Sequence, residues 1–233
     1  MLLLPIFYDT INKKIRIFPQ RSGVMSKKFT ITFGRECGAG ATNIAEILSK
    51  DLNIPYYNKD IFRMVSDKSG VLEEFFHVNN ERPGNNLLYK LIKDLVPKNQ
   101  KPSLGKDIVS PDNLFRFQSE LIQELADNET CMIVGRCADY VLRERENVVR
   151  IFVCGDIESR IHRMMRVFSL ERDAAIERIK ETDKQREKYH SYYTGQDWNN
   201  AANYDLCLNT GTMTIEEAAE HIKLYLKQKG YID

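Results

Sequence analysis

The stretch FTITFGRECGAGATNIAEILSKDLNIP, from Phe29 to Pro55, joins an apolar segment, a glycine-rich turn and an amphipathic segment in direct succession. Aromatic and β-branched residues run up to Phe33 and stop at Gly34, which predicts a buried strand. After the turn, apolar residues recur at helical spacing from Ile44 to Leu52, with polar residues between them on the opposite face. The stretch therefore predicts a strand, a tight turn and a helix.

The turn itself, from Gly34 to Thr42, is rich in small residues. A turn between the carboxyl end of a strand and the amino end of a helix can direct several backbone N–H groups at one point, and such a point attracts phosphate. The usual pattern, G-x-x-x-x-G-K-[ST], matches only in part, because Arg35 stands at the first glycine and Ala41 at the lysine. The alternative is a tight turn that needs glycine only for its backbone angles. The motif alone leaves both interpretations open.

Length and composition set the outer limits. A chain of 233 residues corresponds to one elaborated domain, or to a core with an inserted subdomain. Its 34 basic and 33 acidic residues give a net charge of +1, which argues against general affinity for nucleic acid or for an anionic membrane. The five cysteines form no C-x-x-C pair, so we expect no disulfide framework and a cytoplasmic location. No feature of the sequence specifies an oligomeric state.

Residues 1–24 differ in character from the rest of the chain. The apolar run MLLLPIF is too short to span a membrane, and Met25 resembles a conventional start placed just before the first strand. We expect residues 1–24 to be an N-terminal extension, and the main domain to occupy residues 25–233. The extension is either the result of a misassigned start codon or a short extra hairpin from Ile15 to Phe18.

Strand and helix patterns alternate along most of the remaining chain. A short aromatic run from Ile54 to Tyr57 fits a second parallel strand. Alternation of this kind predicts a parallel sheet between helices, with ligands bound at the carboxyl ends of the strands. Gly34-Arg35 and Gly135-Arg136 both fall at such ends. The other expected elements are helices from residue 60 onward and over 112–126, 138–143 and 215–226, the last with a capping box at Thr214, and strands over 131–134, 148–153 and 204–209.

Two regions depart from this alternation. Residues 66–110 are polar, with proline and glycine breakers around a helical LLYKLIKDL segment, and we expect an inserted region there. Residues 156–190 form two helical stretches dense in basic residues, with Arg160 and Arg163 on one face. A break with Ser169 as the cap would fold them into a helical hairpin. Such a hairpin beside a phosphate turn has the shape of a lid; the alternative is a solvated basic face.

Four segments together resemble the cytidylate kinase-like family, within the P-loop nucleoside monophosphate kinases. They are ITFGRECGAGATNIAEIL with IPYYNKDIF, CMIVGRCADYVL, ESRIHRMM with ETDKQREKY, and NYDLCLNTGTMTIEEAAEHI. The resemblance implies a three-layer α/β/α P-loop NTPase fold with a parallel sheet, a helical lid and an inserted acceptor-binding region. The corresponding domain parts are a core of residues 25–65, 111–155 and 201–233, an acceptor-side insertion at 66–110 and a lid region at 156–200.

The resemblance also accounts for the incomplete motif, because members of the family commonly carry R-E-x-G-x-G-G in place of a loop with lysine. It implies ATP- and Mg²⁺-dependent phosphorylation of a nucleoside monophosphate, with CMP or dCMP as the first candidates. The donor phosphates would then be held by backbone N–H groups, and the Thr42 hydroxyl would lie nearest to Mg²⁺. The residues of this expected ATP site are Gly38, Ala39, Gly40, Ala41 and Thr42.

Charged residues complete the expected site. We hypothesise that Arg35, Arg160 and Arg163 supply the positive charge that lysine would normally provide. The resemblance implies that Arg136 holds the acceptor phosphate and that Asp183 and Arg186 contact the acceptor nucleotide and the phosphates; the alternative for the latter two is a plain i,i+3 salt bridge. The full expected set is catalytic Arg35, Arg160, Arg163 and Arg186, and substrate-binding Arg63, Arg136 and Asp183.

Two other functions stay open at this point. The missing lysine is compatible with a nucleotide-binding protein that has little or no kinase activity. The altered region 66–110 is compatible with a kinase for another small acceptor, since P-loop folds host many substrates. The four histidines, His77, His162, His190 and His221, show no metal-ligand spacing and are predicted to lie at the surface.

Overall fold

The computed structural model describes residues 27–71, 73, 76 and 110–233. The expected N-terminal extension and most of the expected insertion, including the LLYKLIKDL segment, lie outside these residues. The described part of the chain contains no helix that combines the length and the apolar character needed to cross a membrane.

A five-stranded sheet in the order β2-β3-β1-β4-β5 forms the centre of the molecule. All four pairings between neighbouring strands are parallel, as the alternation of strands and helices predicts. The central strand is β1, whose carboxyl end runs into the glycine-rich turn. The strands are β1 (Thr30–Arg35), β2 (Tyr56–Tyr57), β3 (Cys131–Val134), β4 (Val148–Cys154) and β5 (Leu206–Asn209).

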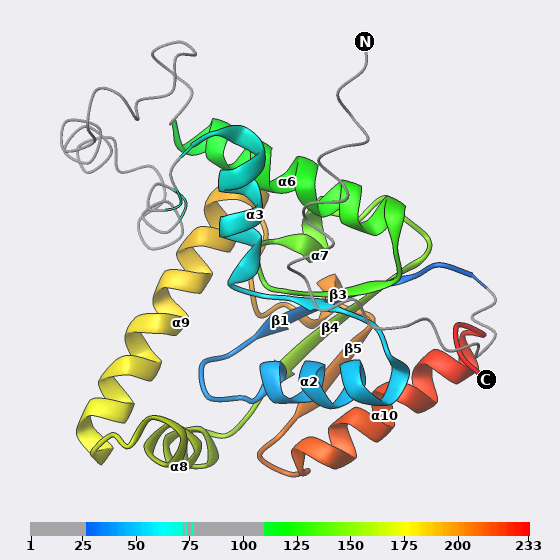
Figure 1. The fold of residues 1–233 in the computed structure, drawn as a ribbon. Helices are drawn as coiled ribbons and strands as arrows, with labels where there is room; N and C mark the ends of the chain where they lie inside the picture. Colours follow the sequence, from blue (N-terminus) through cyan, green and yellow to red (C-terminus); the bar gives the residue numbers. More distant parts are fainter. Residues whose placement is uncertain (1–26, 72, 74–75, 77–109) are drawn as a thin grey trace, which may run out of the picture.

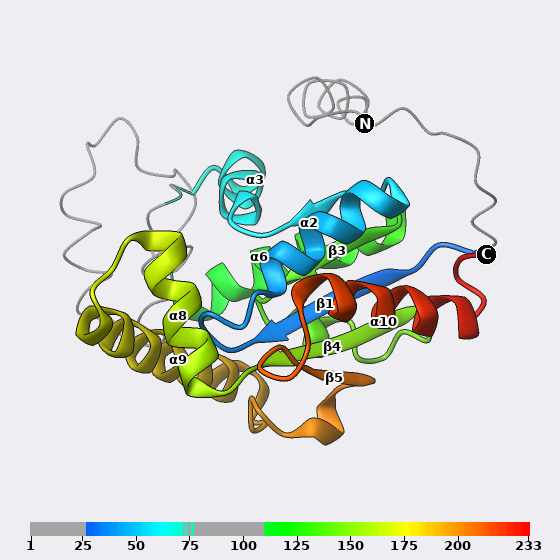
Figure 2. The same ribbon diagram turned by 90° about the horizontal axis from the view of Figure 1, so that it is seen from below.

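Helices cover both faces of the sheet, so the three-layer α/β/α prediction is confirmed (Figures 1 and 2). One apolar cluster joins α2 (Ala41–Leu52) and α10 (Ile215–Gln228) to Met132 and Val134 of β3. The other joins α3 (Asp60–Ser69), α6 (Pro111–Asn128) and α7 (Ala138–Val141) to Cys131 and Ile133. Alternate residues of β3 thus face opposite layers, which is why this strand is apolar throughout.

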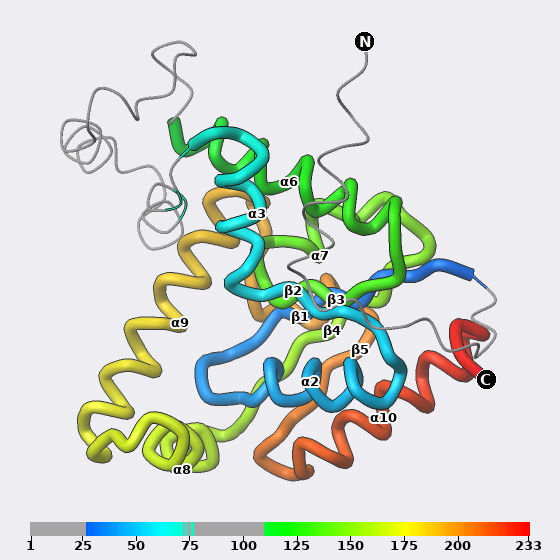
Figure 3. The backbone as a smooth tube through the Cα atoms, viewed as in Figure 1, coloured from blue at the N-terminus to red at the C-terminus, as the bar shows by residue number. Residues whose placement is uncertain are grey.

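The two basic stretches form the helices α8 (Ile157–Phe168) and α9 (Arg172–Thr194), and the helical hairpin is confirmed. Ser169 caps the carboxyl end of α8 in the left-handed conformation (φ 52°), whereas Glu171 is the N-cap residue of α9. Figures 2 and 3 both show the turn between β1 and α2 running beside α8. The hairpin therefore lies at the edge of the sheet where the strands end.

Two local predictions are wrong. The helix expected over residues 138–143 is a single turn that ends at Val141. His190 is buried (4% exposed) instead of lying at the surface, and its Nε2 lies 2.9 Å from Oδ2 of Asp139 in α7. The carboxyl-terminal part of α9 brings the imidazole to α7, and a contact between residues so distant in sequence leaves no local pattern.

Candidate functional site

The glycine-rich turn forms an open cradle of backbone N–H groups. Gly38 and Gly40 adopt positive φ angles of 78° and 87°, and Gly40 is the N-cap of α2 without any side-chain cap. In the part of the chain that the structure describes, the N–H groups of Gly38, Gly40, Ala41 and Thr42 donate to no protein group. Uncommitted N–H groups at the start of a helix attract an anion. The turn therefore fits the phosphates of ATP.

Close packing explains why glycine and alanine occupy this turn. A Cβ at Gly40 would lie 2.3 Å from Cδ1 of Ile215, and one at Gly38 would lie 2.9 Å from the carbonyl oxygen of Arg160. Ala41, at the position of the usual lysine, is 2% exposed and belongs to the apolar cluster beneath α2 and α10. The positive charge of the site must therefore come from other residues.

Arg35, Arg136 and Arg186 form a cluster of guanidinium groups, which we call the arginine cluster, at the carboxyl ends of β1 and β3. The Arg35 side chain lies so close to Gly135 that a Cβ there would be 1.8 Å from its Nη1. Nη1 of Arg186 donates to the carbonyl oxygen of Arg35 at 3.1 Å. Arg136 lies with its Cζ 3.7 Å from the centre of the Phe62 ring, in cation–π geometry. Two of these arginines, at the strand ends, were expected to lie together, and the structure brings them together with the third.

The side chains of the arginine cluster repel one another, and the carboxylate of Asp183 attracts Arg35 and Arg186. Burial, followed by repulsion from Arg186 and Arg136, lowers the pKa of Arg35 well below its usual value. Burial likewise lowers the pKa of Arg186, and it lowers the pKa of Arg136 to about 10. Among the described residues, no carboxylate forms an ion pair with Arg35 or Arg186. A buried cationic group of this kind gains stability from a bound anion.

Backbone strain accompanies this arrangement. Gly135, Arg136 and Cys137 are all left-handed, with φ angles of 80°, 63° and 53°. For the two residues other than glycine this conformation costs roughly 1–2 kcal/mol each. The side-chain amide of Gln118 donates to the carbonyl oxygen of Arg136 at 3.1 Å and helps to hold it. Strain maintained by neighbouring contacts is common where a side chain must be aimed at a ligand.

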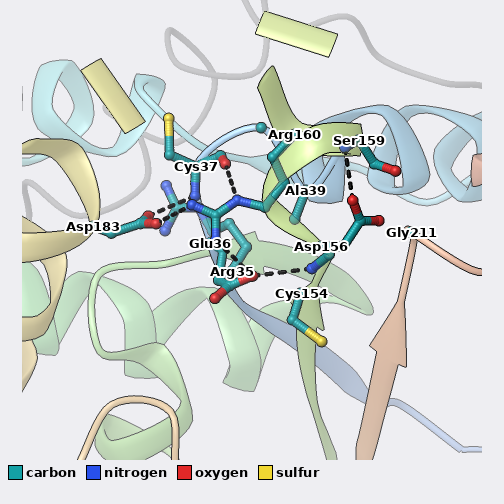
Figure 4. Close-up of polar contacts among 12 residues, drawn as sticks. Arg35, Glu36, Cys37, Ala39, Cys154, Asp156, Ser159, Arg160, Asp183 and Gly211 are labelled. Carbon is teal, nitrogen blue, oxygen red and sulfur yellow. Dashed lines mark hydrogen bonds and ion pairs between the residues drawn. The ribbon is translucent and has the colours of Figure 1, made fainter. Parts of the chain in front are cut away.

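Arg160 and Asp183 lie on the other side of the turn and bind each other (Figure 4). Nη1 of Arg160 lies 2.9 Å from Oε2 of Glu36, and its Nε donates to the carbonyl oxygen of Cys37 at 2.9 Å. Asp183 accepts from the backbone N–H of Cys37 at 2.6 Å. In the described part of the chain Asp183 and Arg186 form no ion pair with each other, so the plain i,i+3 salt bridge is not observed.

Arg163, Thr42 and Arg63 occupy three different places. Arg163 donates to the carbonyl oxygen of Gly38 and, at 3.3 Å, to the hydroxyl of Thr210. The Thr42 hydroxyl accepts from the amide of Asn58 at 3.4 Å. The Arg63 side chain is 60% exposed and lies 3.9 Å from Asp60 of its own helix, so the structure does not bring it to the other expected site residues.

The residues present fit magnesium through oxygen ligands. Within the described ranges no group of three or more His, Cys, Asp or Glu side chains is placed to hold a metal ion. Mg²⁺ commonly keeps several waters and binds through substrate phosphates and one or two protein oxygens, so such a group is not required. The Thr42 hydroxyl, at the start of α2, is the side-chain oxygen that fits this role.

Glu36 and Thr210 also shape the site, although neither is among the residues that the sequence predicted for it. Glu36 accepts from the N–H of Gly155 at 3.0 Å as well as pairing with Arg160. Thr210 is 3% exposed, and its hydroxyl donates to the carbonyl oxygen of Ala39 at 2.8 Å. The position of Thr210 directly after β5, at the carboxyl end of the sheet, was the available signal.

A parallel sheet flanked by helices, a glycine turn from its central strand and a helical hairpin beside that turn together define a three-layer α/β/α P-loop fold. The family model described as "Cytidylate kinase-like family" matches residues 30–212, so the chain belongs to the cytidylate kinase-like family. The resemblance inferred from the four sequence segments is confirmed, and membership supports a phosphotransferase of the kinase type.

One curated protein and one solved structure are similar to this chain. A cytidylate kinase from Sulfurisphaera tokodaii is 22% identical over 190 residues, which cover 81% of this chain and 90% of that protein. The solved structure of an uncharacterized protein from Eubacterium ventriosum ATCC 27560 is similar with a TM-score of 0.62 and 24% identity, covering 86% of this chain and 99% of that one. The second similarity shows that the fold is shared.

The mutual repulsion of the arginines in the cluster leads to a first prediction. Pyrophosphate at about 100 times its Kd is expected to raise the free energy of unfolding by about 2.7 kcal/mol. For a domain of this size that corresponds to a rise in Tm of roughly 5–10 °C. Differential scanning fluorimetry with sodium chloride at matched ionic strength is the control. An equal shift with chloride, or an unchanged shift in Arg186→Met, would contradict a specific anion site.

Proposed function

We propose that the protein transfers the γ-phosphoryl group of ATP to a nucleoside monophosphate, with CMP and dCMP as the first candidates. The observation that carries the proposal is the arginine cluster beside the glycine-rich turn, in which Arg35 and Arg186 form no ion pair among the described residues. Two adjoining sites for anions are what a donor and a phosphorylated acceptor require. Membership of the cytidylate kinase-like family supports this combination.

The turn is assigned to the donor. Its uncommitted N–H groups bind and orient the phosphates of ATP, whereas the N–H of Ala39 donates to the carbonyl oxygen of Glu36 at 3.3 Å. Thr42 would hold Mg²⁺, and the ion would supply positive charge at the donor phosphates. Arg163, at the opposite side of the turn, adds positive charge near Gly40. The donor is thus held mainly by backbone groups, whose positions are set by the packing of the turn.

The arginine cluster is assigned to the acceptor phosphate and the moving phosphoryl group. Arg136 holds the acceptor phosphate, and its cation–π contact with Phe62 keeps the guanidinium from rotating freely. Arg35 is the last residue of β1 and adjoins the donor turn, so it neutralises charge between the two substrates. Arg186, bonded to the carbonyl oxygen of Arg35, supplies further positive charge. Phosphoryl transfer needs alignment and charge neutralisation more than covalent help from the protein.

The acceptor base is assigned to the region around residues 66–110. We propose that this segment is the acceptor-side insertion, that residues 156–200 form the lid, and that residues 25–65, 111–155 and 201–233 form the core. The start of α3 contributes Phe62 to the Arg136 contact, so this side of the sheet adjoins the acceptor phosphate. The base of the nucleotide then extends away from the donor turn.

An assay of ADP release with ATP and a panel of acceptors tests the proposal. CMP, dCMP, UMP and AMP are compared with a reaction that lacks an acceptor, and ATP binding is measured separately by calorimetry. We expect turnover with a pyrimidine monophosphate well above the reaction without acceptor. Binding of ATP without turnover on any acceptor would contradict the proposal and favour a nucleotide-binding protein. Turnover only with a small acceptor outside the panel would replace the proposed substrate class.

A further inference from the structure

The α8–α9 hairpin contacts the backbone N–H, the carbonyl oxygen and the side chain of Cys37 in the glycine-rich turn. Its N–H donates to Asp183 of α9 at 2.6 Å, and its carbonyl oxygen accepts from Nε of Arg160 in α8 at 2.9 Å. Its side chain belongs to an apolar cluster with Ile161, Met164 and two residues of α9, and its Sγ lies 3.9 Å from Sδ of Met164. The turn is therefore docked on both helices of the hairpin.

Arg160 lies at the centre of these contacts (Figure 4). Its side chain is 7% exposed, and its guanidinium binds Glu36 of the turn, Asp183 of α9 and the carbonyl oxygen of Cys37. Two carboxylates surround one guanidinium, so its charge is already compensated. A guanidinium that turned toward ATP would leave two partly buried carboxylates without their cation, which is unfavourable.

Arg35 and Arg186 differ from Arg160 in their ion pairs. Arg35 and Arg186 have no ion pair among the described residues, whereas Arg160 has two. A residue that receives an anionic substrate needs free positive charge, and a residue that holds a loop needs committed partners. The structure therefore separates these two roles between different arginines.

We propose that Arg160 is a positioning residue that, together with Glu36 and Asp183, clamps the phosphate turn to the α8–α9 hairpin. The clamp fixes the N–H groups of the turn before ATP arrives and makes the position of the hairpin and the conformation of the turn change together. Arg160 and Asp183 then act on ATP through the turn instead of touching a nucleotide. The catalytic consequence rests on the proposed kinase function, whereas the clamp itself does not.

Amide hydrogen exchange of Glu36, Cys37 and Ala39, whose N–H groups are hydrogen-bonded, tests the clamp without any turnover. Glu36→Gln and Asp183→Asn keep the size of each side chain and remove its charge. We expect each of them, and Arg160→Met, to speed this exchange by about tenfold or more, because groups that open locally exchange faster. Arg160→Lys keeps the charge but cannot serve three acceptors in a fixed fork, so we expect an intermediate effect.

A matched control is available between the same two helices. Arg172 of α9 binds Glu158 of α8 at 2.7 Å in an exposed ion pair away from the turn. Arg172→Met is expected to leave the exchange of Glu36, Cys37 and Ala39 unchanged. The charge-free triple variant Glu36→Gln/Arg160→Met/Asp183→Asn guards against misfolding, because replacing a whole buried ion network is tolerated better than removing one partner.

Binding of a non-hydrolysable ATP analogue, measured by calorimetry, separates the clamp from a direct phosphate contact. The clamp predicts that Glu36→Gln and Asp183→Asn weaken binding as Arg160→Met does, by about tenfold, and that their effects combine non-additively. Unchanged exchange in all three single variants, or weakened binding in Arg160→Met alone, would overturn the clamp. If the wild-type protein transfers no phosphoryl group, the proposed function is wrong. The hydrogen-exchange measurement then still tests the clamp by itself.

Discussion

Arg35→Ala is expected to lower kcat/KM for phosphoryl transfer by on the order of 10³-fold, the usual effect of removing an arginine that neutralises the moving phosphoryl group. The guanidinium of Arg35 packs against Gly135 at the end of β3 and adjoins the donor turn. Ala41 leaves no lysine to share its role. We propose that Arg35 carries the charge that the usual motif places on lysine, so this substitution should be the most damaging single change in the site.

The Tm of Arg35→Ala distinguishes a role of Arg35 in neutralising charge from a role in holding the fold together. Arg35 is a buried cation repelled by Arg136 and Arg186, so its removal relieves repulsion. We expect Tm of Arg35→Ala to be unchanged or higher while activity falls, as is common for residues kept for function. The control is Arg116→Ala, which removes an exposed arginine paired with Glu120 on α6 and should leave both quantities unchanged. Activity of Arg35→Ala close to that of the wild type would refute the assignment.

Gly135→Ala is expected to lower activity nearly as much as Arg35→Ala, although it adds only one methyl group. The new Cβ would lie 1.8 Å from Nη1 of Arg35, so the guanidinium must move. The residue also has a φ of 80°, which a side chain adopts with strain. Steady-state kinetics of both single variants and of the double variant measures the effect as a double-mutant cycle.

The cycle identifies the mechanism of the loss. If Gly135 acts by leaving space for Arg35, the double variant should be no worse than Arg35→Ala alone. Gly195→Ala is the matched control, because this glycine at the end of α9 has a φ of 68° and no atom within 4 Å of a built Cβ. Gly195→Ala should introduce similar backbone strain and leave kcat/KM unchanged. Additive losses in the double variant would show that Gly135 matters for another reason.

Most of the fold could be predicted because it follows from local patterns. The apolar run Cys131–Val134 has the composition of a strand buried on both faces, and both its faces are buried. Thr214 and Glu217 form the predicted capping box of α10. Arg35 and Arg136 were expected at the carboxyl ends of strands, and they lie at the ends of β1 and β3, which are parallel neighbours.

The partners of the charged side chains could not be predicted in the same way. Arg160 and Arg163 look equivalent in sequence, three residues apart on one helix face. Only the docking of α8 on the turn, through a hydrogen bond that joins residues 123 positions apart, shows that the first of them is committed to carboxylates. The burial of His190 against Asp139 likewise depends on where α9 crosses α7, and α9 is polar around most of its surface.

The structure also changes what the glycine-rich turn implies. As a motif, the turn lacked its lysine and left two interpretations open. In the structure Ala41 belongs to the core, and positive charge reaches the site from the ends of two strands and from α9. The absence of lysine is thus compatible with an active phosphoryl-transfer site.

Transfer of the labelled γ-phosphoryl group from [γ-³²P]ATP to CMP tests the central claim most directly. In the presence of Mg²⁺, the wild-type protein is predicted to place the label on a nucleoside diphosphate product, and Arg35→Ala is predicted to do so on the order of 10³-fold more slowly. A wild-type protein that binds ATP but leaves the label in ATP or in inorganic phosphate, with CMP and dCMP present, would contradict the claim.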